Sequence, residues 1–315
     1  MPKNKCLVCM QPLPENRTDY HLNCCQSLFE QPFAPELNYR RHELGQLAKK
    51  IIRQSVTVPG VQAKLSMHIR KTRDKGTRLT LVGLWGNFIL KPPTDLYAHL
   101  PENEALTMQL ATLFGIETVP HGLIRLASKE LAYITRRIDR TLKHKIPMED
   151  FCQLSLRMTE HKYRGSYEQL AKIITAYCQN TLFEILKFYE LILFCFLTGN
   201  ADMHLKNFSL IYENHSSIRL APAYDLLNTR LVLTEKQDPE ETALTLDGKK
   251  SKFTRSNFIR FGLSIGLTNR QIDNVFQRFE SSLAHALDLF SKSFLPDSFA
   301  GKYQEIFQER CNRLF

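Results

Sequence analysis

The chain has 315 residues, of which 43% are hydrophobic and 23% are charged, as in an ordinary soluble globular protein with a sizeable core. Its formal net charge of +10 favours an anionic ligand, a nucleic acid or an acidic protein surface as partner, unless the basic residues serve solubility alone. The longest apolar run, 191–197, is too short to span a bilayer and residues 1–9 do not resemble a signal peptide, so we expect a cytoplasmic protein without a membrane partner.

The first 50 residues are expected to form an N-terminal segment, which contains four of the eight cysteines. Without an export signal, such a cluster favours a metal or reduced thiols over disulfides. Cys6-Leu-Val-Cys9 followed by His21-Leu-Asn-Cys24 offers four soft ligands at the spacing of a tetrahedral site, which predicts a structural Zn²⁺. Cys25 is an alternative ligand, and four reduced side chains without a metal are the alternative to zinc.

A loop at residues 55–64 follows a predicted helix at 44–52. Its sequence is Ser-Val-Thr-Val-Pro-Gly-Val-Gln-Ala-Lys, and from Ala63 onward apolar and polar residues alternate as in a strand. A Pro59-Gly60 loop that opens onto a strand can expose backbone N–H groups to phosphate, as nucleotide-covering loops do. A plain turn between two elements is the alternative.

Lys91 is the next candidate for a functional side chain. Two strands are expected at 78–84 and 88–90, joined by a hairpin turn at 85–87, and Lys91 ends the second strand directly before two prolines. This is the position of a lysine that pairs with nucleotide phosphates, with an exposed lysine at a strand end as the alternative.

A helical glutamate is expected to fix this lysine by an ion pair. The sequence predicts a helix over 102–114 with an apolar stripe formed by Leu106, Leu110 and Leu113. Glu104 is the first choice for the ion pair and Glu102 is the alternative. Either carboxylate can instead serve only to stabilise the start of the helix.

The rest of the chain predicts two lobes. Strands at 119–126 and 131–138 complete an N-lobe of residues 51–140, and the charged sequence 136–140 is the expected hinge to a C-lobe of residues 141–315. The C-lobe is expected to be mostly helical, with helices at 149–156, 166–178, 181–197, 257–263, 269–289 and 298–313. Between these helices we expect two short strands, near 208–212 and 218–220, and a mobile polar loop at 233–251. This pattern predicts an α+β, bilobal fold with a ligand-binding cleft between the lobes.

The most informative stretch is 198–208, Thr-Gly-Asn-Ala-Asp-Met-His-Leu-Lys-Asn-Phe, between an expected helix and an expected strand. Asp202 and Asn207 stand five residues apart in it, and Asp225 follows after a strand-sized gap. Phosphoryl-transfer enzymes use this order, in which one carboxylate orients the attacking hydroxyl while the amide oxygen and the second carboxylate hold magnesium. Alone, Asp202 is equally suited to cap a loop, Asn207 to form a turn and Asp225 to cap a helix.

The order of the whole set favours a kinase, because a phosphate loop, a strand lysine, a helical glutamate, Asp-x4-Asn and a later Asp follow one another. Lys91 would then hold the α- and β-phosphates of ATP, and His204 or Lys206 would reach the γ-phosphate. Such a site works by positioning and charge neutralisation, which explains why the set contains few reactive nucleophiles.

These motifs resemble those of the HipA-type serine/threonine kinases of bacterial toxin–antitoxin systems, from about Val56 to the C-terminus. In this chain, residues 199–208 resemble the family's catalytic motif and residues 222–225 its metal-binding motif. Residues 59–64 resemble its nucleotide loop and residues 87–92 its lysine strand. The chain is most similar to the short HipT toxins of HipBST systems, because 86–92, 102–104 and 119–122 match that form. We also expect it to lack the extra N-terminal subdomain of longer HipA proteins, as HipT does. Pro59 replaces a small or phosphorylatable residue of the family, and the Cys/His cluster is not general to it.

The resemblance implies a protein serine/threonine kinase that depends on ATP and Mg²⁺ and acts as a toxin. Its implied substrate is an aminoacyl-tRNA synthetase, tryptophanyl in the HipT case and glutamyl in the HipA case, so that translation and growth stop. Autophosphorylation of the nucleotide loop is implied at Thr57, with Ser55 as the second candidate. The implied ATP-binding residues are Pro59, Gly60, Val61, Gln62, Lys64, Lys91, Glu104, Arg136, Arg137, Ile138, His204, Lys206 and Tyr224.

The resemblance also implies partners. A HipB-like helix-turn-helix antitoxin is expected, through which any DNA contact would run, together with a small HipS-like protein. Two other functions remain open from the sequence: a kinase of the same core with a small-molecule or lipid substrate, and a non-enzymatic, zinc-containing regulator that binds nucleic acid.

Overall fold

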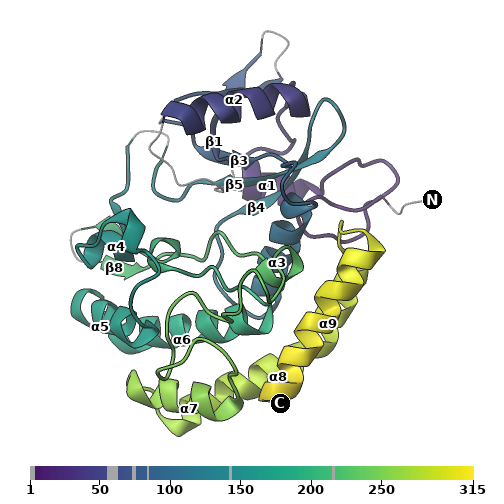
Figure 1. Cartoon of the computed structure of the whole chain (residues 1–315). Helices are drawn as coiled ribbons and strands as arrows, with labels where there is room; N and C mark the ends of the chain where they lie inside the picture. The colour runs from purple at the N-terminus through teal and green to yellow at the C-terminus, as the bar shows by residue number, and fades with distance from the viewer. Residues whose placement is uncertain (1–3, 55–62, 73–75, 84, 142–143, 215–216) are drawn as a thin grey trace. The chain divides into compact units, whose positions relative to one another are not determined.

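A computed structural model of the chain describes residues 4–54, 63–72, 76–83, 85–141, 144–214 and 217–315 (Figure 1). The chain divides into two compact units. The first comprises Met1–Leu106, Val119–His144 and Lys292–Leu295, and the second comprises Thr107–Thr118, Lys145–Ser291 and Pro296–Phe315. The N-terminal segment and the strands that follow it therefore form one unit, whereas residues 107–118, expected in the N-lobe, belong to the second.

An antiparallel five-stranded sheet with the order β2-β1-β3-β5-β4 forms the centre of the first unit. Its strands are β1 (Leu65–Lys71), β2 (Thr77–Leu81), β3 (Phe88–Lys91), β4 (His121–Arg125) and β5 (Leu131–Arg136). Alternation along β1 buries Leu65 and Met67, and Leu90 and Ile134 of the neighbouring strands are buried as well. The period-2 pattern of the sequence thus produces one apolar face, as expected.

The hairpin predicted at 85–87 is wrong, because β2 and β3 do not pair with each other. Instead, β1 lies between them and pairs with both. Gly86 permits this arrangement, since a Cβ atom there would lie 2.4 Å from the Ser66 hydroxyl and 2.5 Å from the Met67 carbonyl oxygen. The chain passes so close to β1 at this point that only a residue without a side chain fits.

Helices accompany the sheet: α1 (Leu22–Phe29), α2 (Arg41–Gln54) and the beginning of α3 (Leu100–Leu113). The ring of Phe29 in α1 packs against Phe88 of β3, with ring centroids 6.0 Å apart. Gly115 ends α3 with a φ of +78°, as its position after the apolar stripe predicts. Leu106 and Leu110 of that stripe are buried, but Leu113 is 37% exposed, so the stripe is shorter than expected.

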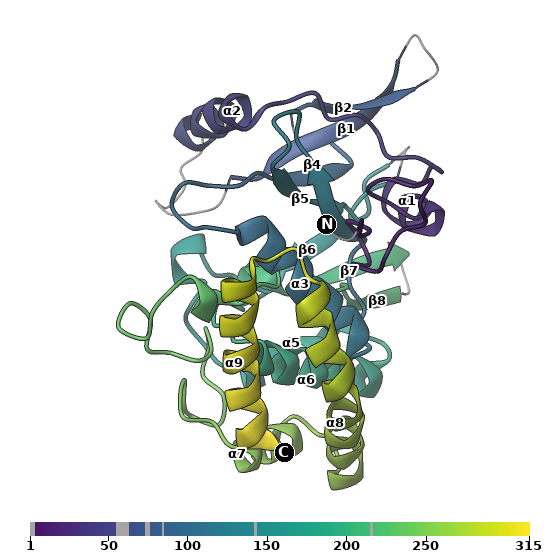
Figure 2. The same cartoon turned by 90° about the vertical axis from the view of Figure 1, so that its right-hand side faces the viewer.

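Helices dominate the second unit: α4 (Phe151–Leu154), α5 (Tyr167–Tyr177), α6 (Thr181–Leu197), α7 (Arg255–Ser264), α8 (Asn269–Lys292) and α9 (Asp297–Leu314). The second half of α6, 191–197, contains only apolar side chains and is buried throughout, so it forms the core of the unit. Figure 2 shows α8 and α9 side by side, and they run antiparallel, with Phe290 beside Phe307 and Phe276 beside Phe315. Among the described residues, no helix has the length and apolar character that crossing a membrane requires.

A small antiparallel sheet accompanies these helices, with the order β6-β7-β8 and the strands β6 (Met148–Asp150), β7 (Ser209–Asn214) and β8 (Ser217–Leu220). Residues 149 and 150 were expected in a helix and instead pair with β7. The helix starts only at Phe151, because the Asp150 carboxylate accepts a hydrogen bond from the Gln153 backbone N–H at 2.9 Å and caps it.

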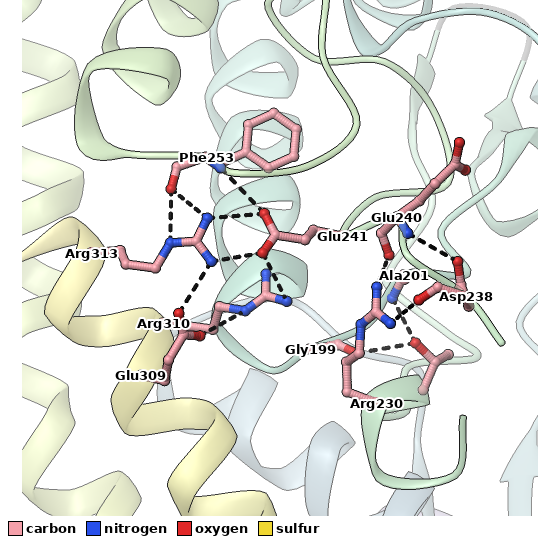
Figure 3. Close-up of polar contacts among 11 residues, drawn as sticks. Gly199, Ala201, Arg230, Asp238, Glu240, Glu241, Phe253, Glu309, Arg310 and Arg313 are labelled. Atoms are coloured by element: carbon pink, nitrogen blue, oxygen red, sulfur yellow. Dashed lines mark hydrogen bonds and ion pairs between the residues drawn. The ribbon is translucent and has the colours of Figure 1, made fainter. Parts of the chain in front are cut away.

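Residues 233–251, expected to be a mobile loop, are held on the second unit by buried and charged side chains. The Arg230 guanidinium donates to the carbonyl oxygens of Asp238 and Glu240, and the Glu241 carboxylate pairs with Arg310 and Arg313 of α9 (Figure 3). Leu244 and Leu246 are fully buried. Three carboxylates of the polar segment are held in ion pairs: Glu241 with Arg310 and Arg313, Glu240 with Lys250, and Asp247 with Arg260.

Candidate functional site

The polar stretch 198–208 begins where α6 ends. Gly199 turns the chain with a φ of +67°, and a Cβ atom at this position would lie 2.9 Å from the Asn228 side-chain oxygen. The Thr229 hydroxyl accepts a hydrogen bond from the Ala201 N–H at 2.9 Å and donates one to the Gly199 carbonyl oxygen at 3.1 Å. Figure 3 shows Gly199 and Ala201 beside Arg230, whose backbone N–H also donates to the Gly199 carbonyl oxygen. The segment around Thr229 therefore fixes the first half of the stretch.

Asp202 is half-buried and receives hydrogen bonds from two directions. The Tyr163 hydroxyl donates to its carboxylate at 2.6 Å, and the Asn207 side-chain nitrogen donates to its backbone carbonyl oxygen at 2.9 Å. This second bond fixes the amide of Asn207 and turns its oxygen away from the Asp202 carbonyl. The spacing Asp-x4-Asn thus closes a compact loop in which one carboxylate and one amide oxygen are held in fixed orientations.

Asp225 follows β8 in a loop that is tied to the same stretch. The Tyr224 hydroxyl donates to the Lys206 carbonyl oxygen at 3.2 Å and accepts from the Ser209 hydroxyl at 2.6 Å. Asp225 itself has a φ of +60°, a left-handed conformation that costs a non-glycine residue on the order of 1 kcal/mol and is tolerated best by Asp and Asn. The surrounding hydrogen bonds keep this carboxylate in a conformation that the backbone does not favour by itself.

Lys206 and His204, which lie between Asp202 and Asn207, were the candidates to reach the γ-phosphate of ATP. The structure gives each of them surroundings that the sequence did not predict. Lys206 forms an ion pair with the Asp150 carboxylate at 2.7 Å, so its ammonium group is already engaged within the protein. His204 is 5% exposed, and its burial lowers the pKa of its imidazole against the opposing charges of Asp202 and Asp225. Burial therefore disfavours the cationic form of His204.

Lys91 and Glu104 form a buried ion pair in the first unit. Their side-chain nitrogen and oxygen atoms are 2.5 Å apart, and the side chains are only 4% and 1% exposed. The Lys91 ammonium also lies over the ring of Tyr133, 5.4 Å from its centroid. Glu102, the alternative partner, instead lies 3.8 Å from His99, and burial raises the pKa of its carboxyl. Lys91 therefore pairs with Glu104, the first choice from the sequence, and not with Glu102.

The backbone at 136–138 was expected to contact ATP. The Arg136 N–H donates to the Pro120 carbonyl oxygen and the Arg137 N–H to the Asn87 carbonyl oxygen, so both donors already have partners within the protein. The Arg137 guanidinium pairs with Asp139 at 2.6 Å. A nucleotide contact at this segment therefore depends on other atoms, such as the backbone of Ile138.

The predicted nucleotide loop lies outside the described residues. This applies to Ser55 and Thr57, the expected autophosphorylation sites, and to Pro59, Gly60, Val61 and Gln62. Lys64 is described and directly precedes β1.

The chemistry of the second-unit residues fits magnesium. Asn207 and Asp225 offer an amide oxygen and carboxylate oxygens, which are the hard ligands that Mg²⁺ prefers. Two buried atoms of the same stretch, Asn200 Nδ2 and His204 Nδ1, have no hydrogen-bond partner among the described residues. Buried polar atoms without a partner are rare in folded proteins, so these two atoms are available to a ligand or an ordered water.

The four predicted zinc ligands also come together. The ligand atoms of Cys6, Cys9, His21 and Cys24 all lie within 4.8 Å of one another. Cys25, the alternative ligand, is not a member of this group, and burial raises the pKa of its thiol to about 11.

Sequence reasoning missed Tyr163 and Thr229, although both contact the candidate catalytic stretch directly. Tyr163 lies 39 residues before its partner Asp202, and Thr229 lies 30 residues after Gly199. Neither belongs to a motif with a fixed spacing, and the sequence carries no signal that could have found them.

Comparisons with known proteins agree with these motifs. Residues 56–287 match the family model of the HipA-like C-terminal domain. A Haemophilus influenzae protein named "Putative kinase" is 28% identical over 93% of this chain and 92% of its own length. The Sinorhizobium fredii protein "Putative kinase Y4dM" is 32% identical over 55% of this chain, which spans 45% of that relative.

Two solved structures share the fold. A chain of the Shewanella oneidensis MR-1 toxin–antitoxin complex of HipA, HipB and operator DNA is similar over 96% of this chain and 74% of its own, with a TM-score of 0.68 and 20% identity. The Helicobacter pylori proinflammatory kinase CtkA is similar over 72% of this chain and 86% of its own, with a TM-score of 0.52 and 13% identity. The family model covers well over half of the sequence, and the fold agrees with it: the chain belongs to the HipA-like kinase family.

Proposed function

We propose that this protein is an ATP- and Mg²⁺-dependent serine/threonine protein kinase that acts as the toxin of a toxin–antitoxin system. The observation that carries the proposal is the arrangement in the second unit, where Asp202, Asn207 and the Asp225 loop are joined by hydrogen bonds. The buried Lys91–Glu104 pair of the first unit supports it, because kinases fix their phosphate-binding lysine by such a pair.

In this mechanism Asp202 orients the hydroxyl of the protein substrate and accepts its proton as phosphate transfer proceeds. Tyr163 holds the Asp202 carboxylate through its hydroxyl, and Asn207 fixes the loop through the Asp202 carbonyl oxygen. Asn207 and Asp225 would bind Mg²⁺, which neutralises charge on the phosphate oxygens. Lys91 would bind the α- and β-phosphates, with Glu104 setting the position of its ammonium group.

The resemblance to HipA-type kinases is the basis for proposing a substrate class, a mode of regulation and partners. We infer that the substrate is an aminoacyl-tRNA synthetase, tryptophanyl first, and that phosphorylation of Thr57 or Ser55 silences the kinase. The likeness to a chain from a HipA–HipB–DNA complex supports a HipB-like antitoxin as partner, with DNA contacts running through the antitoxin. A small HipS-like protein would be the third component.

Phosphate transfer from γ-labelled ATP to purified tryptophanyl- and glutamyl-tRNA synthetases tests the proposal. We expect Asp202→Ala and Asp225→Asn to lower the rate by roughly 10³-fold or more, and induced expression of these variants no longer to arrest growth. Asp273→Asn is the matched control, because Asp273 is an exposed carboxylate of the same unit. Undiminished transfer by Asp202→Ala would contradict the mechanism, and label found only on a small molecule would replace the protein substrate with a metabolite or lipid.

A further inference from the structure

The N-terminal knuckle, residues 6–24, contains a cluster of side chains that the kinase reaction does not use. Its four ligand atoms come from Cys6, Cys9, His21 and Cys24 and lie within 4.8 Å of one another. A tetrahedral zinc site with three sulfur ligands and one nitrogen ligand has ligand–ligand distances of roughly 3.3–3.8 Å. The Cys9 sulfur and His21 Nδ1 are already 3.3 Å apart. A small contraction of the remaining distances therefore produces a complete coordination sphere.

The imidazole of His21 is oriented for metal binding by a second contact. Its Nε2 lies 3.1 Å from the Pro12 carbonyl oxygen, which can only accept a hydrogen bond. Nε2 must therefore carry the proton, and Nδ1 presents its lone pair to the cysteine sulfur atoms. Histidine ligands of metals typically have such a hydrogen bond on the other ring nitrogen, and it fixes both the tautomer and the ring orientation.

The backbone of the knuckle is shaped around the first two cysteines. The Met10 N–H donates to the Cys6 carbonyl oxygen at 3.0 Å, the Cys6 N–H donates to the Gln11 carbonyl oxygen at 2.9 Å, and Met10 has a left-handed φ of +61°. This tight turn brings the thiols of Cys6 and Cys9 to the same side. The third thiol comes from α1, in which Cys24 and Cys25 point in directions about 100° apart, since a helix has 3.6 residues per turn.

We propose that Cys6, Cys9, His21 and Cys24 bind one structural Zn²⁺ ion in a closed tetrahedral site. Four protein ligands leave no open position for a substrate or water, so the ion stabilises the fold and takes no part in phosphate transfer. Cys25 is excluded as a ligand, because it lies on the buried side of α1. The proposal is independent of the kinase mechanism.

The site would anchor the knuckle to the edge of the first-unit sheet. The Leu123 N–H of β4 donates to the Leu7 carbonyl oxygen at 2.8 Å, and the Tyr20 hydroxyl donates to the Leu123 carbonyl oxygen at 2.8 Å. A Cβ atom at Gly122 would lie 2.8 Å from the Val8 side chain, so the knuckle approaches β4 closely. Because β4 is an edge strand, a knuckle that is held in place by zinc satisfies and covers its backbone groups.

Metal analysis of the full-length protein, purified without a metal-chelating tag, tests the proposal. We expect one equivalent of zinc in the wild type and in Cys25→Ser, and close to none in Cys24→Ser. Cys24 and Cys25 are adjacent residues of one helix, so this pair separates ligation from general disturbance of α1. Equal loss of zinc in both variants, or a metal-free wild type that does not take up added Zn²⁺, would overturn the site.

Two measurements on the wild type remain decisive if Cys24→Ser does not fold. Co²⁺ added to chelator-treated protein should bind at one equivalent and give the absorption of a tetrahedral thiolate site, and Zn²⁺ should abolish it. Chelation should lower the midpoint of thermal unfolding by roughly 10 °C. An octahedral Co²⁺ spectrum, an unchanged midpoint, or six instead of eight reactive thiols in the chelated, denatured protein would each contradict the proposal.

Discussion

Lys91 and Glu104 in the first unit lie almost entirely out of water, whereas Asp202 in the second unit is only half-buried. The ion pair is fixed by burial, since neither charge can leave the other without remaining in an apolar environment. Asp202 is fixed by a network instead: Tyr163 holds its carboxylate and Asn207 holds its backbone carbonyl. The same task, holding a charged group in one position, is thus achieved in two physically different ways.

Mutations of the buried ion pair and of the Asp202 network should therefore affect different properties, namely stability and catalysis. Removing one partner of a buried pair leaves an uncompensated charge, so the stability of the first unit should suffer most. Removing one hydrogen bond from a half-buried carboxylate costs little stability, because water can replace the lost partner. Its effect should appear in the reaction, where the orientation of the carboxylate matters.

The largest effect is expected for Glu104→Gln. The amide has almost the same shape as the carboxylate but removes the negative charge that Glu104 places 2.5 Å from the buried Lys91 ammonium. We expect the free energy of unfolding to fall by about 3–5 kcal/mol, measured by urea denaturation.

Two further variants sharpen this prediction. Glu102→Gln should cost less than about 1 kcal/mol, because the His99 contact of Glu102 is long, at 3.8 Å. The double variant Lys91→Met/Glu104→Leu should regain most of the stability but remain inactive, since apolar side chains replace the buried pair. If Glu104→Gln is as stable as the wild type, burial does not fix the pair.

A buried histidine should make the first unit sensitive to acid. His121 in β4 is 6% exposed, and burial lowers its pKa to about 4 from the ordinary value of 6.5. Between these values the unfolded chain binds a proton that the folded unit does not. The free energy of unfolding should therefore decrease as the pH falls from 6.5, by about 2 kcal/mol at pH 5.

Urea denaturation at pH 7 and pH 5 gives the change of the free energy of unfolding with pH, which is the slope that measures this effect. His121→Gln should flatten the slope even if it changes the absolute stability, whereas His285→Gln, at an exposed position of α8, should leave the slope unchanged. An unchanged slope in His121→Gln would show that another group carries the acid sensitivity.

Elements whose signals are local in sequence could be predicted from it. The helix at 181–197 has the observed bounds of α6, because its apolar residues and flanking polar turns lie within the segment itself. The position of β1 between β2 and β3 could not be predicted, since strand order depends on contacts that no single window of sequence contains. For the same reason Asp150 was expected in the first turn of a helix, although it caps that helix and pairs with β7.

The candidate site likewise depends on contacts between residues that are distant in the sequence, and not all of these contacts could be predicted. Lys91 ends β3 and Glu104 lies in the second turn of α3, the next element, so their pairing could be inferred from the order of strand and helix. The partner of Lys206 was not predicted, because Asp150 lies 56 residues away in the sequence. Motif spacing therefore identified the charged residues, and the structure was needed to show which of them already have partners.

Tyr163→Phe provides the smallest and most specific test of the network. The change removes one hydroxyl, which donates to the Asp202 carboxylate at 2.6 Å, and keeps the ring beside His204. We expect kcat to fall about tenfold with little change in KM for ATP or in stability, because the carboxylate loses its orientation but stays in place. Tyr177→Phe is the matched control, since both tyrosines are 45% exposed and Tyr177 lies in α5. Steady-state kinetics of the two variants decide the matter: equal kcat values would mean that Tyr163 covers Asp202 without positioning it.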